Sequence, residues 1–337
     1  MMVTRLLFML FISAMDSKEL EREIPTLVRI YKDGSIERLQ NSPFVAPNLE
    51  DDSTTVSSKD VIISENPPIS ARLYIKNTII KRSSQEHNNL KKVPVLVYFH
   101  GGGFFFESAF NELHHNYFNK FASVIDVLVV SVEYRLAPET LLPAAYEDCW
   151  EALKWVAGGG ANPEPWVVKH GDMNRVFIGG DSAGANIAHN IAMRAGVEAL
   201  PKGVKLVGAF MSHSYFYGSE PVGSEPVAGH EQSAPCLVWS LVYPSAPGGI
   251  DNPSMNPLVA GAPSLRGLGC SKILVCVAAQ DPMTDRGVLY YEAVRNSGWL
   301  GRAELFHVDG EGHAFHIHNP NSYNAMKMIL RFKDFLQ

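Results

Sequence analysis

The fold of this chain is decided by the stretch Val176-Phe177-Ile178-Gly179-Gly180-Asp181-Ser182-Ala183-Gly184. An apolar, β-rich run is followed by a G-x-S-x-G pentapeptide, and a helical pattern begins near Ala183. That context places Ser182 on a sharp turn between a buried strand and a helix, which suits a nucleophile. The two outer glycines keep side chains from colliding where strand and helix cross. We therefore predict that Ser182 is a nucleophile; the alternative is a structural serine in a turn.

Apolar strands and helical segments alternate on both sides of this stretch. Strands are expected at 93–99, 127–132, 176–178, 204–210, 273–278 and 303–308, and helices at 143–157, 183–197, 284–297 and 321–336. This alternation predicts an α/β fold with a mainly parallel sheet covered on both faces.

The remaining segments are expected to lie around this sheet. Further strands are predicted at 61–64 and 71–75, and 28–31 followed by an Asp-Gly turn indicates a hairpin. The polar residues 77–92 are expected to form a surface loop. The proline-rich segment 214–265 breaks the alternation, so we expect an insertion over one end of the sheet.

The composition excludes several classes of protein. Hydrophobic residues make up 46% of the 337 and charged residues 19%, which excludes a disordered, collagen-like or coiled-coil chain. The net charge is −6 and no basic run exceeds two residues, so the sequence predicts no nucleic-acid partner. Four cysteines without a CxxC pair predict neither a disulfide framework nor a zinc site.

A second motif, His100-Gly101-Gly102-Gly103-Phe104, directly follows the expected strand 93–99. Consecutive glycines allow backbone N–H groups to face a ligand without hindrance from a Cβ atom. We predict an oxyanion hole formed by the N–H groups of Gly102, Gly103 and Ala183. The alternatives are a flexible loop or a phosphate-binding loop, and the latter lacks the following Lys-Ser/Thr.

A nucleophilic serine needs a base that a third group orients, and after this type of elbow the order is Ser, Asp or Glu, then His. Asp281 follows the expected strand 273–278 and is the predicted acid, with Asp285 as the rival. His313 lies in the loop after 303–308 and is the predicted base. His316 and His318 fall in the following turn, and their spacing matches no familiar metal site, so we expect no metal.

Other motifs accompany these residues: 133–139 (EYRLAPE), 143–148 (PAAYED), 270–275 (CSKILV) and 313–315 (HAF). From about residue 24 to 335, the chain resembles plant carboxylesterases of the hormone-sensitive-lipase-like α/β-hydrolase group. The resemblance implies an α/β-hydrolase fold: a mostly parallel eight-stranded sheet flanked by helices, with a helical cap from about 15–45 and 214–265. It also implies a serine carboxylesterase that needs no cofactor, acts on a small ester or flavonoid-like molecule, and is a monomer or weak dimer.

Within that group, segments 162–166, 218–225, 229–233 and 247–253 resemble 2-hydroxyisoflavanone dehydratase-like members. Some of those dehydratases have threonine at the nucleophile position, so Ser182 favours an esterase, and a dehydrating lyase is the alternative. Residues 212–216 (SHSYF) replace the usual His-Pro-Tyr-Phe, which leaves the shape of the acyl pocket open there. A receptor that shares the fold lacks the catalytic histidine, so His313 disfavours a purely non-catalytic receptor.

The first residues are interpreted separately. A basic start followed by apolar residues 6–14 fits a signal peptide, and the rival is read-through upstream of Met15. We expect 15–337 to form a single domain and the protein to be cytoplasmic, or secreted if 1–14 is a signal peptide. No apolar run approaches the ~18–20 residues of a membrane span, so stable membrane insertion is not expected.

Overall fold

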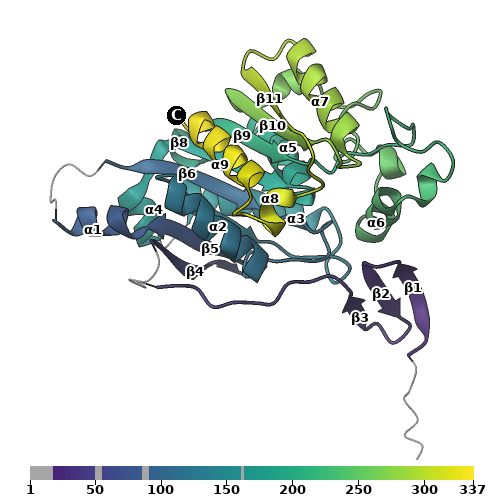
Figure 1. The fold of residues 1–337 in the computed structure, drawn as a ribbon, viewed down its shortest axis with the longest axis horizontal. Helices are drawn as coiled ribbons and strands as arrows, with labels where there is room; N and C mark the ends of the chain where they lie inside the picture. Colours follow the sequence, from purple (N-terminus) through teal and green to yellow (C-terminus); the bar gives the residue numbers. More distant parts are fainter. Residues whose placement is uncertain (1–17, 50–54, 86–90, 161–162) are drawn as a thin grey trace, which may run out of the picture. The chain divides into compact units, whose positions relative to one another are not determined.

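A computed structural model describes residues 18–49, 55–85, 91–160 and 163–337 (Figure 1). The chain forms two compact units, Met1–Gln40 and Asn41–Gln337. The signal-peptide or read-through segment expected at 1–14 lies outside the described residues.

The described part of the first unit is a small antiparallel sheet. Its strands are β1 (Leu20–Ile24), β2 (Val28–Tyr31) and β3 (Ile36–Arg38), in that spatial order. The predicted hairpin is confirmed: Gly34 has φ 82°, and the Asp33 carboxylate accepts a hydrogen bond from the Ser35 N–H. The helical contribution expected from 15–45 is replaced over 20–38 by these strands, in which Ile24 and Val28 are buried and Arg29 on β2 bonds Glu23 on β1.

The second unit is built on an eight-stranded sheet of order β11-β10-β9-β8-β6-β7-β5-β4. The strands are β4 (Val56–Glu65), β5 (Pro68–Lys76), β6 (Val93–Phe99), β7 (Leu128–Glu133), β8 (Gly171–Asp181), β9 (Leu206–Ser212), β10 (Lys272–Ala278) and β11 (Arg302–Val308). Only β5 runs against the others, since it pairs antiparallel with both β4 and β7. The predicted strands and the mostly parallel sheet are confirmed, and the carboxyl ends of β6, β8, β9 and β10 meet at one edge.

Helices cover both faces of this sheet. The helices of this unit are α1 (Asn77–Gln85), α2 (Glu112–Val124), α3 (Ala144–Lys154), α4 (Pro165–His170), α5 (Ala183–Ala195), α6 (Ala234–Val242), α7 (Thr284–Asn296), α8 (Phe315–His318) and α9 (Tyr323–Phe335), and α6 belongs to the insertion. On one face α2 packs against α9, where the rings of Phe121 and Phe332 meet edge to face at 5.1 Å. The alternate strand residues Val95 and Val97 are also fully buried, and α3 and α5 lie behind the sheet in Figure 1.

Of the predictions for two segments outside the central alternation of strands and helices, one is wrong in part and the other is confirmed. The surface loop predicted for 77–92 is wrong over its first half, which forms α1, because Ile79 buries against the sheet and gives this polar stretch an apolar side. The segment 214–265 is irregular, as predicted, and contains α6 together with short 3₁₀ turns.

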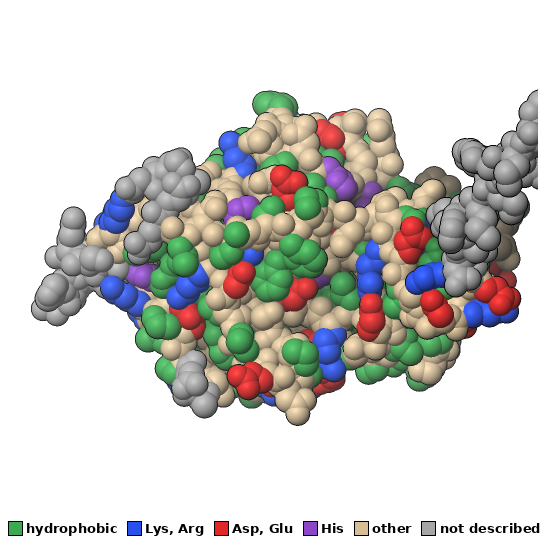
Figure 2. All heavy atoms as spheres, turned by 90° about the horizontal axis from the view of Figure 1, so that it is seen from below, with side chains coloured by type: hydrophobic (Ala, Val, Ile, Leu, Met, Phe, Trp, Pro, Cys, Tyr) green, Lys and Arg blue, Asp and Glu red, His purple; other side chains and the backbone are tan. Residues whose placement is uncertain are grey.

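Basic and acidic side chains are interspersed on the face of the molecule shown in Figure 2. Over the described ranges, the structure contains no helix with the length and apolarity that crossing a bilayer requires.

Candidate active site

Ser182 sits on the turn that the sequence predicts. β8 ends at Asp181 and α5 begins at Ala183, and Ser182 between them has φ 53° and ψ −116°. Such a conformation costs a non-glycine residue of order 1–3 kcal/mol and persists only where its surroundings enforce it. A Cβ atom on Gly184 would overlap the carbonyl oxygen of Phe99, and one on Gly180 would overlap the backbone of Gly184. The predicted reason for both glycines is therefore confirmed.

The backbone of Ser182 is hydrogen-bonded to the end of β9 and to the residues that follow it. Its N–H donates to the carbonyl oxygen of Ser212 at 2.9 Å, and its carbonyl oxygen accepts from the N–H of Tyr215 at 3.1 Å. The Asn186 N–H bonds the same carbonyl oxygen as the first bond of α5. The nucleophile candidate is thus tied both to its own helix and to the chain that follows β9.

The glycine loop after β6 has the backbone that glycine permits. Gly102 has φ 96° and Gly103 has φ 59°. The N–H groups of Gly102, Gly103 and Ala183 donate to no acceptor within the part of the chain that the structure describes. Uncommitted backbone donors are what an oxyanion hole would need.

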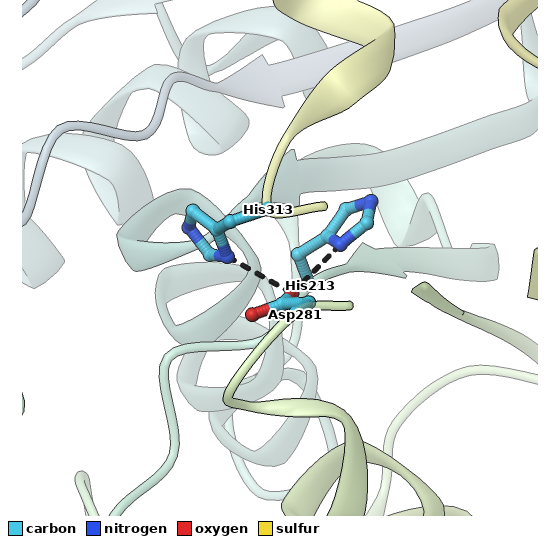
Figure 3. Close-up of side chains that lie close together, drawn as sticks. All are labelled: His213, Asp281 and His313. Carbon is cyan, nitrogen blue, oxygen red and sulfur yellow. Dashed lines mark hydrogen bonds and ion pairs between the residues drawn. The ribbon is translucent and has the colours of Figure 1, made fainter. Parts of the chain in front are cut away.

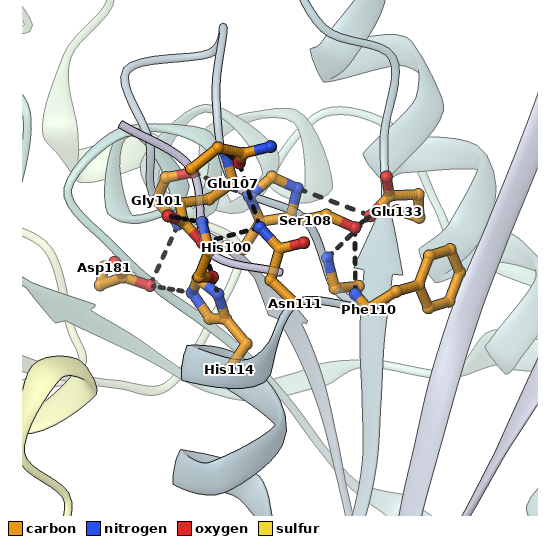
Figure 4. Close-up of polar contacts among 12 residues, drawn as sticks. His100, Gly101, Glu107, Ser108, Phe110, Asn111, His114, Glu133 and Asp181 are labelled. Carbon is orange, nitrogen blue, oxygen red and sulfur yellow. Dashed lines mark hydrogen bonds and ion pairs between the residues drawn. The ribbon is translucent and has the colours of Figure 1, made fainter. Parts of the chain in front are cut away.

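Asp181, which precedes Ser182, holds this loop in place (Figure 4). Its Oδ1 atom accepts hydrogen bonds from the Gly101 N–H at 3.1 Å and the Tyr98 hydroxyl at 2.8 Å, and His114 Nε2 lies 3.6 Å away. Burial alone would raise the pKa of the Asp181 carboxyl, but the interactions with His114 and Tyr98 outweigh it and hold that pKa well below its usual range. A buried anion therefore links the elbow to the glycine loop.

Asp281 and His313, the predicted acid and base, are in contact. His313 Nδ1 lies 2.9 Å from Asp281 Oδ2 (Figure 3). The Asp281 side chain is 1% exposed and the His313 side chain 34%, so the imidazole reaches open space while the carboxylate is enclosed. Ser182, by contrast, makes no hydrogen bond to His313 over the described ranges; such bonds are often long without substrate.

A second imidazole, which the sequence analysis assigned only to the shape of the pocket, contacts the same carboxylate oxygen. His213, directly after β9, places Nδ1 2.8 Å from Asp281 Oδ2. Burial would raise the pKa of Asp281, yet the hydrogen bonds from His213 and His313 outweigh it and keep that pKa well below its usual range. The position of His213 at the end of a strand adjacent to the one before Asp281 was the sequence signal that could have revealed it.

The rival residues have other partners. Asp285 Oδ2 accepts hydrogen bonds from the N–H and hydroxyl of Ser224, which lower the pKa of Asp285. His316 is buried, with its ring stacked on that of His213 at 5.4 Å, and burial lowers its pKa well below the usual value. His318 is exposed on α8. None of the three is hydrogen-bonded to the candidate dyad within the described residues.

His213, Asp281 and His313 also have the mutual spacing of a metal-binding group, with their ligand-type atoms within 4.8 Å of one another. Both Nδ1 atoms, however, lie at hydrogen-bonding distance from a single carboxylate oxygen rather than around a common centre. The group is a hydrogen-bonded cluster.

A cavity of about 700 Å³ lies away from these residues. It adjoins Val93 and Arg175 near the amino ends of β6 and β8, whereas Ser182 follows the carboxyl end of β8. Its lining includes seven basic residues: Lys76, Arg82, Lys91, Lys92, Lys169, Arg175 and Lys333. This cavity therefore lies at the opposite end of β8 from Ser182.

A mostly parallel eight-stranded sheet with a serine elbow after β8 defines an α/β hydrolase. The chain belongs to the α/β-hydrolase fold family, whose profile matches residues 96–317. Two relatives are the 2-hydroxyisoflavanone dehydratases of Glycyrrhiza echinata, 54% identical (96% of this chain, 98% of the relative), and Glycine max, 46% identical (95% and 99%). A solved esterase of Pyrobaculum calidifontis is 28% identical with a TM-score of 0.65 (83% and 84% covered). The resemblance inferred from the motifs is confirmed.

Proposed function

We propose that this enzyme is a serine carboxylesterase whose catalytic triad is Ser182, His313 and Asp281. The observation that carries the proposal is the placement of Ser182 on a strained elbow, φ 53° and ψ −116°, at the start of α5. A 2.9 Å Asp281–His313 contact lies beyond the carboxyl ends of β10 and β11, in the same sheet. The esterase from Pyrobaculum calidifontis, with the same fold, supports the assignment to ester chemistry.

The proposed reaction is acyl transfer to water. His313 takes the Ser182 proton as the serine oxygen attacks the ester carbonyl carbon, and Asp281 orients and stabilises the resulting imidazolium. The N–H groups of Gly102, Gly103 and Ala183 stabilise the tetrahedral oxyanion, each worth about 3 kcal/mol in the transition state. His313 then protonates the departing alcohol, and a water molecule releases the acyl group by the same steps in reverse.

A second candidate is the dehydration of a hydroxylated flavonoid-like molecule. The observation that favours it is the 54% and 46% identity to two 2-hydroxyisoflavanone dehydratases over nearly the whole chain. In that reaction His313 would remove a proton from carbon, the same N–H groups would hold the enolate oxygen, and the adjacent hydroxyl would leave as water. No bond to Ser182 forms on this route.

The test is to assay the purified protein with p-nitrophenyl acetate and with 2-hydroxyisoflavanone side by side, together with the Ser182→Ala variant. We expect the variant to lose ester hydrolysis by a factor approaching ~10⁶, the loss seen on removing the triad serine of subtilisin. Its circular dichroism spectrum should match that of the parent. An alanine variant with a tenth of the parent activity would refute Ser182 as nucleophile, and water loss from 2-hydroxyisoflavanone would establish the second activity.

A further inference from the structure

Two imidazoles share a single oxygen atom of the candidate triad acid. Nδ1 of His213 lies 2.8 Å, and Nδ1 of His313 2.9 Å, from Asp281 Oδ2, and the two rings meet at 75° with their centres 5.6 Å apart (Figure 3). His313 belongs to the loop before α8, whereas His213 follows β9. The oxygen has two lone pairs, so both contacts can be hydrogen bonds at once.

We propose that His213 is a positioning residue: a neutral N–H donor that fixes the Asp281 carboxylate and lowers the basicity of His313 by sharing its acceptor. This inference rests on the proposed triad, in which Asp281 and His313 are the acid and base. It assigns His213 no contact with substrate.

The surroundings of His213 keep it neutral. A carboxylate only accepts hydrogen bonds, so the proton lies on Nδ1 of His213. Its Nε2 is buried and has no hydrogen-bond partner among the described residues, so the cation would place an N–H where nothing accepts it. Burial lowers the pKa of His213, and the attraction of Asp281 offsets only part of that effect.

The other titratable groups around this imidazole do not compete for the role. His316 stacks on it with an interplanar angle of 14° and has no hydrogen-bond partner within the described ranges. Asp181 acts on it through space, since the Asp181 carboxylate is committed to the Gly101 N–H and the Tyr98 hydroxyl, with His114 beside it. Among these groups, only Asp281 is hydrogen-bonded to His213.

Sharing an acceptor has a measurable consequence. Each N–H donor withdraws part of the negative charge of Oδ2, so the His213 donor weakens the attraction that Asp281 exerts on protonated His313. Removing that donor leaves the full charge of Asp281 Oδ2 to His313 and so favours the protonated form of that ring. A base that protonates at higher pH loses activity at higher pH, so the acidic limb of kcat/KM moves upward.

The experiment compares His213→Asn with His213→Leu over a pH series of p-nitrophenyl acetate hydrolysis. The asparagine Nδ2 can occupy the place of the histidine Nδ1, and asparagine tolerates the φ of 52° at this position. We expect the leucine variant to move the acidic limb upward by about 0.5–1 pH unit and to lower kcat about tenfold, with KM little changed. The asparagine variant should keep the limb of the parent and most of its kcat.

His316→Phe is the matched control, because it changes an equally buried ring stacked on His213 that does not bond Asp281. Its acidic limb should coincide with that of the parent. A leucine variant with an unmoved limb, or an asparagine variant that moves as far as leucine, would overturn the positioning role. If Ser182→Ala is inactive but the acidic limb of His213→Leu does not move, the positioning role of His213 is refuted and the proposed triad is not.

A second measurement does not depend on the folding of the leucine variant. Proton NMR of the unmodified protein in water should show two low-field imidazole N–H signals, one from His213 and one from His313. The His213→Asn variant should retain only the His313 signal. A parent spectrum from which His213→Asn removes no low-field signal would mean that His213 donates no hydrogen bond to Asp281, and the proposal would fail.

Discussion

The guanidinium group of Arg286 holds the carboxylate of Glu225 through two hydrogen bonds, from Nε at 2.6 Å and from Nη2 at 2.8 Å. Both residues are buried, at 6% and 8% exposure. Arg286 lies on α7 and Glu225 within the insertion 214–265, so this ion pair fastens the insertion to the helix that follows Asp281. A buried pair of this kind contributes little net stability when intact but is costly to break.

Glu225→Gln should therefore lower the free energy of unfolding by about 3 kcal/mol, because it leaves the Arg286 charge buried without its counter-ion. Urea denaturation measures the change. Glu220→Gln is the control: Glu220 is exposed and bonds Arg286 only through its backbone carbonyl, so its effect should stay within about 0.5 kcal/mol. Equal effects of the two substitutions would show that the ion pair does not anchor the insertion.

Asp281→Asn should reduce kcat far more than Asp285→Asn. Only a carboxylate stabilises the His313 imidazolium, and the amide favours the wrong tautomer, a change that costs about 10⁴ in the trypsin case. Asp285 bonds Ser224 instead, so its replacement should cost less than tenfold. Steady-state rates on p-nitrophenyl acetate decide between them, and parallel losses would refute the choice of Asp281.

Ser182→Thr should separate the two candidate reactions. The added methyl group restricts χ1 and crowds the line of attack, so ester hydrolysis should fall sharply. Dehydration of 2-hydroxyisoflavanone needs no acyl-enzyme and should persist. Both activities are measured in the parent and the variant; a parallel loss of both would show that the two reactions use Ser182 as nucleophile.

Gly184→Ala should destabilise the protein although alanine is the better helix former. The new Cβ atom would overlap the Phe99 carbonyl oxygen, and overpacking of this kind costs about 1–3 kcal/mol. At Gly267 the Cβ of an alanine would meet only a methyl carbon of Met193 at 3.8 Å, so Gly267→Ala is the matched control. Thermal unfolding midpoints should fall for the first variant and stay near the parent for the second.

The central strands and the candidate acid and base were predictable because their signals are local. An apolar, β-rich run such as Val93–Phe99 indicates a buried strand by itself. The order of the strands then places Asp281 in the loop after β10 and His313 in the loop after β11. The sequence did not predict helix α1, because its composition is polar overall. Its apolar side, with the buried Ile79, becomes evident only from its packing against β5.

His213 could be linked to Asp281 only through the order of the strands, because its neighbours in the sequence carry no such signal. Its partner Asp281 is 68 residues away, and the contact exists only because β9 and β10 lie side by side. Strand β1 was likewise hidden, since the charges of Leu20–Ile24 suit a helix until the pairing of this strand with β2 places Arg29 opposite Glu23. In both cases the deciding interaction is between strands, and sequence periodicity does not encode such pairings.

The backbone hydrogen bonds at Ser182 also determine how fast two amide hydrogens exchange with solvent. The Ser182 N–H donates to Ser212 at the end of β9, and the Tyr215 N–H donates to Ser182, so each amide hydrogen exchanges with solvent only when Ser182 parts from residues 212–215. That chain continues directly into the insertion 214–265, so we expect Ser182 and the first residues of the insertion to open in one event. The amide hydrogens of Ser182 and Tyr215 should therefore exchange at similarly slow rates. A ligand that binds to the insertion should slow the exchange of both.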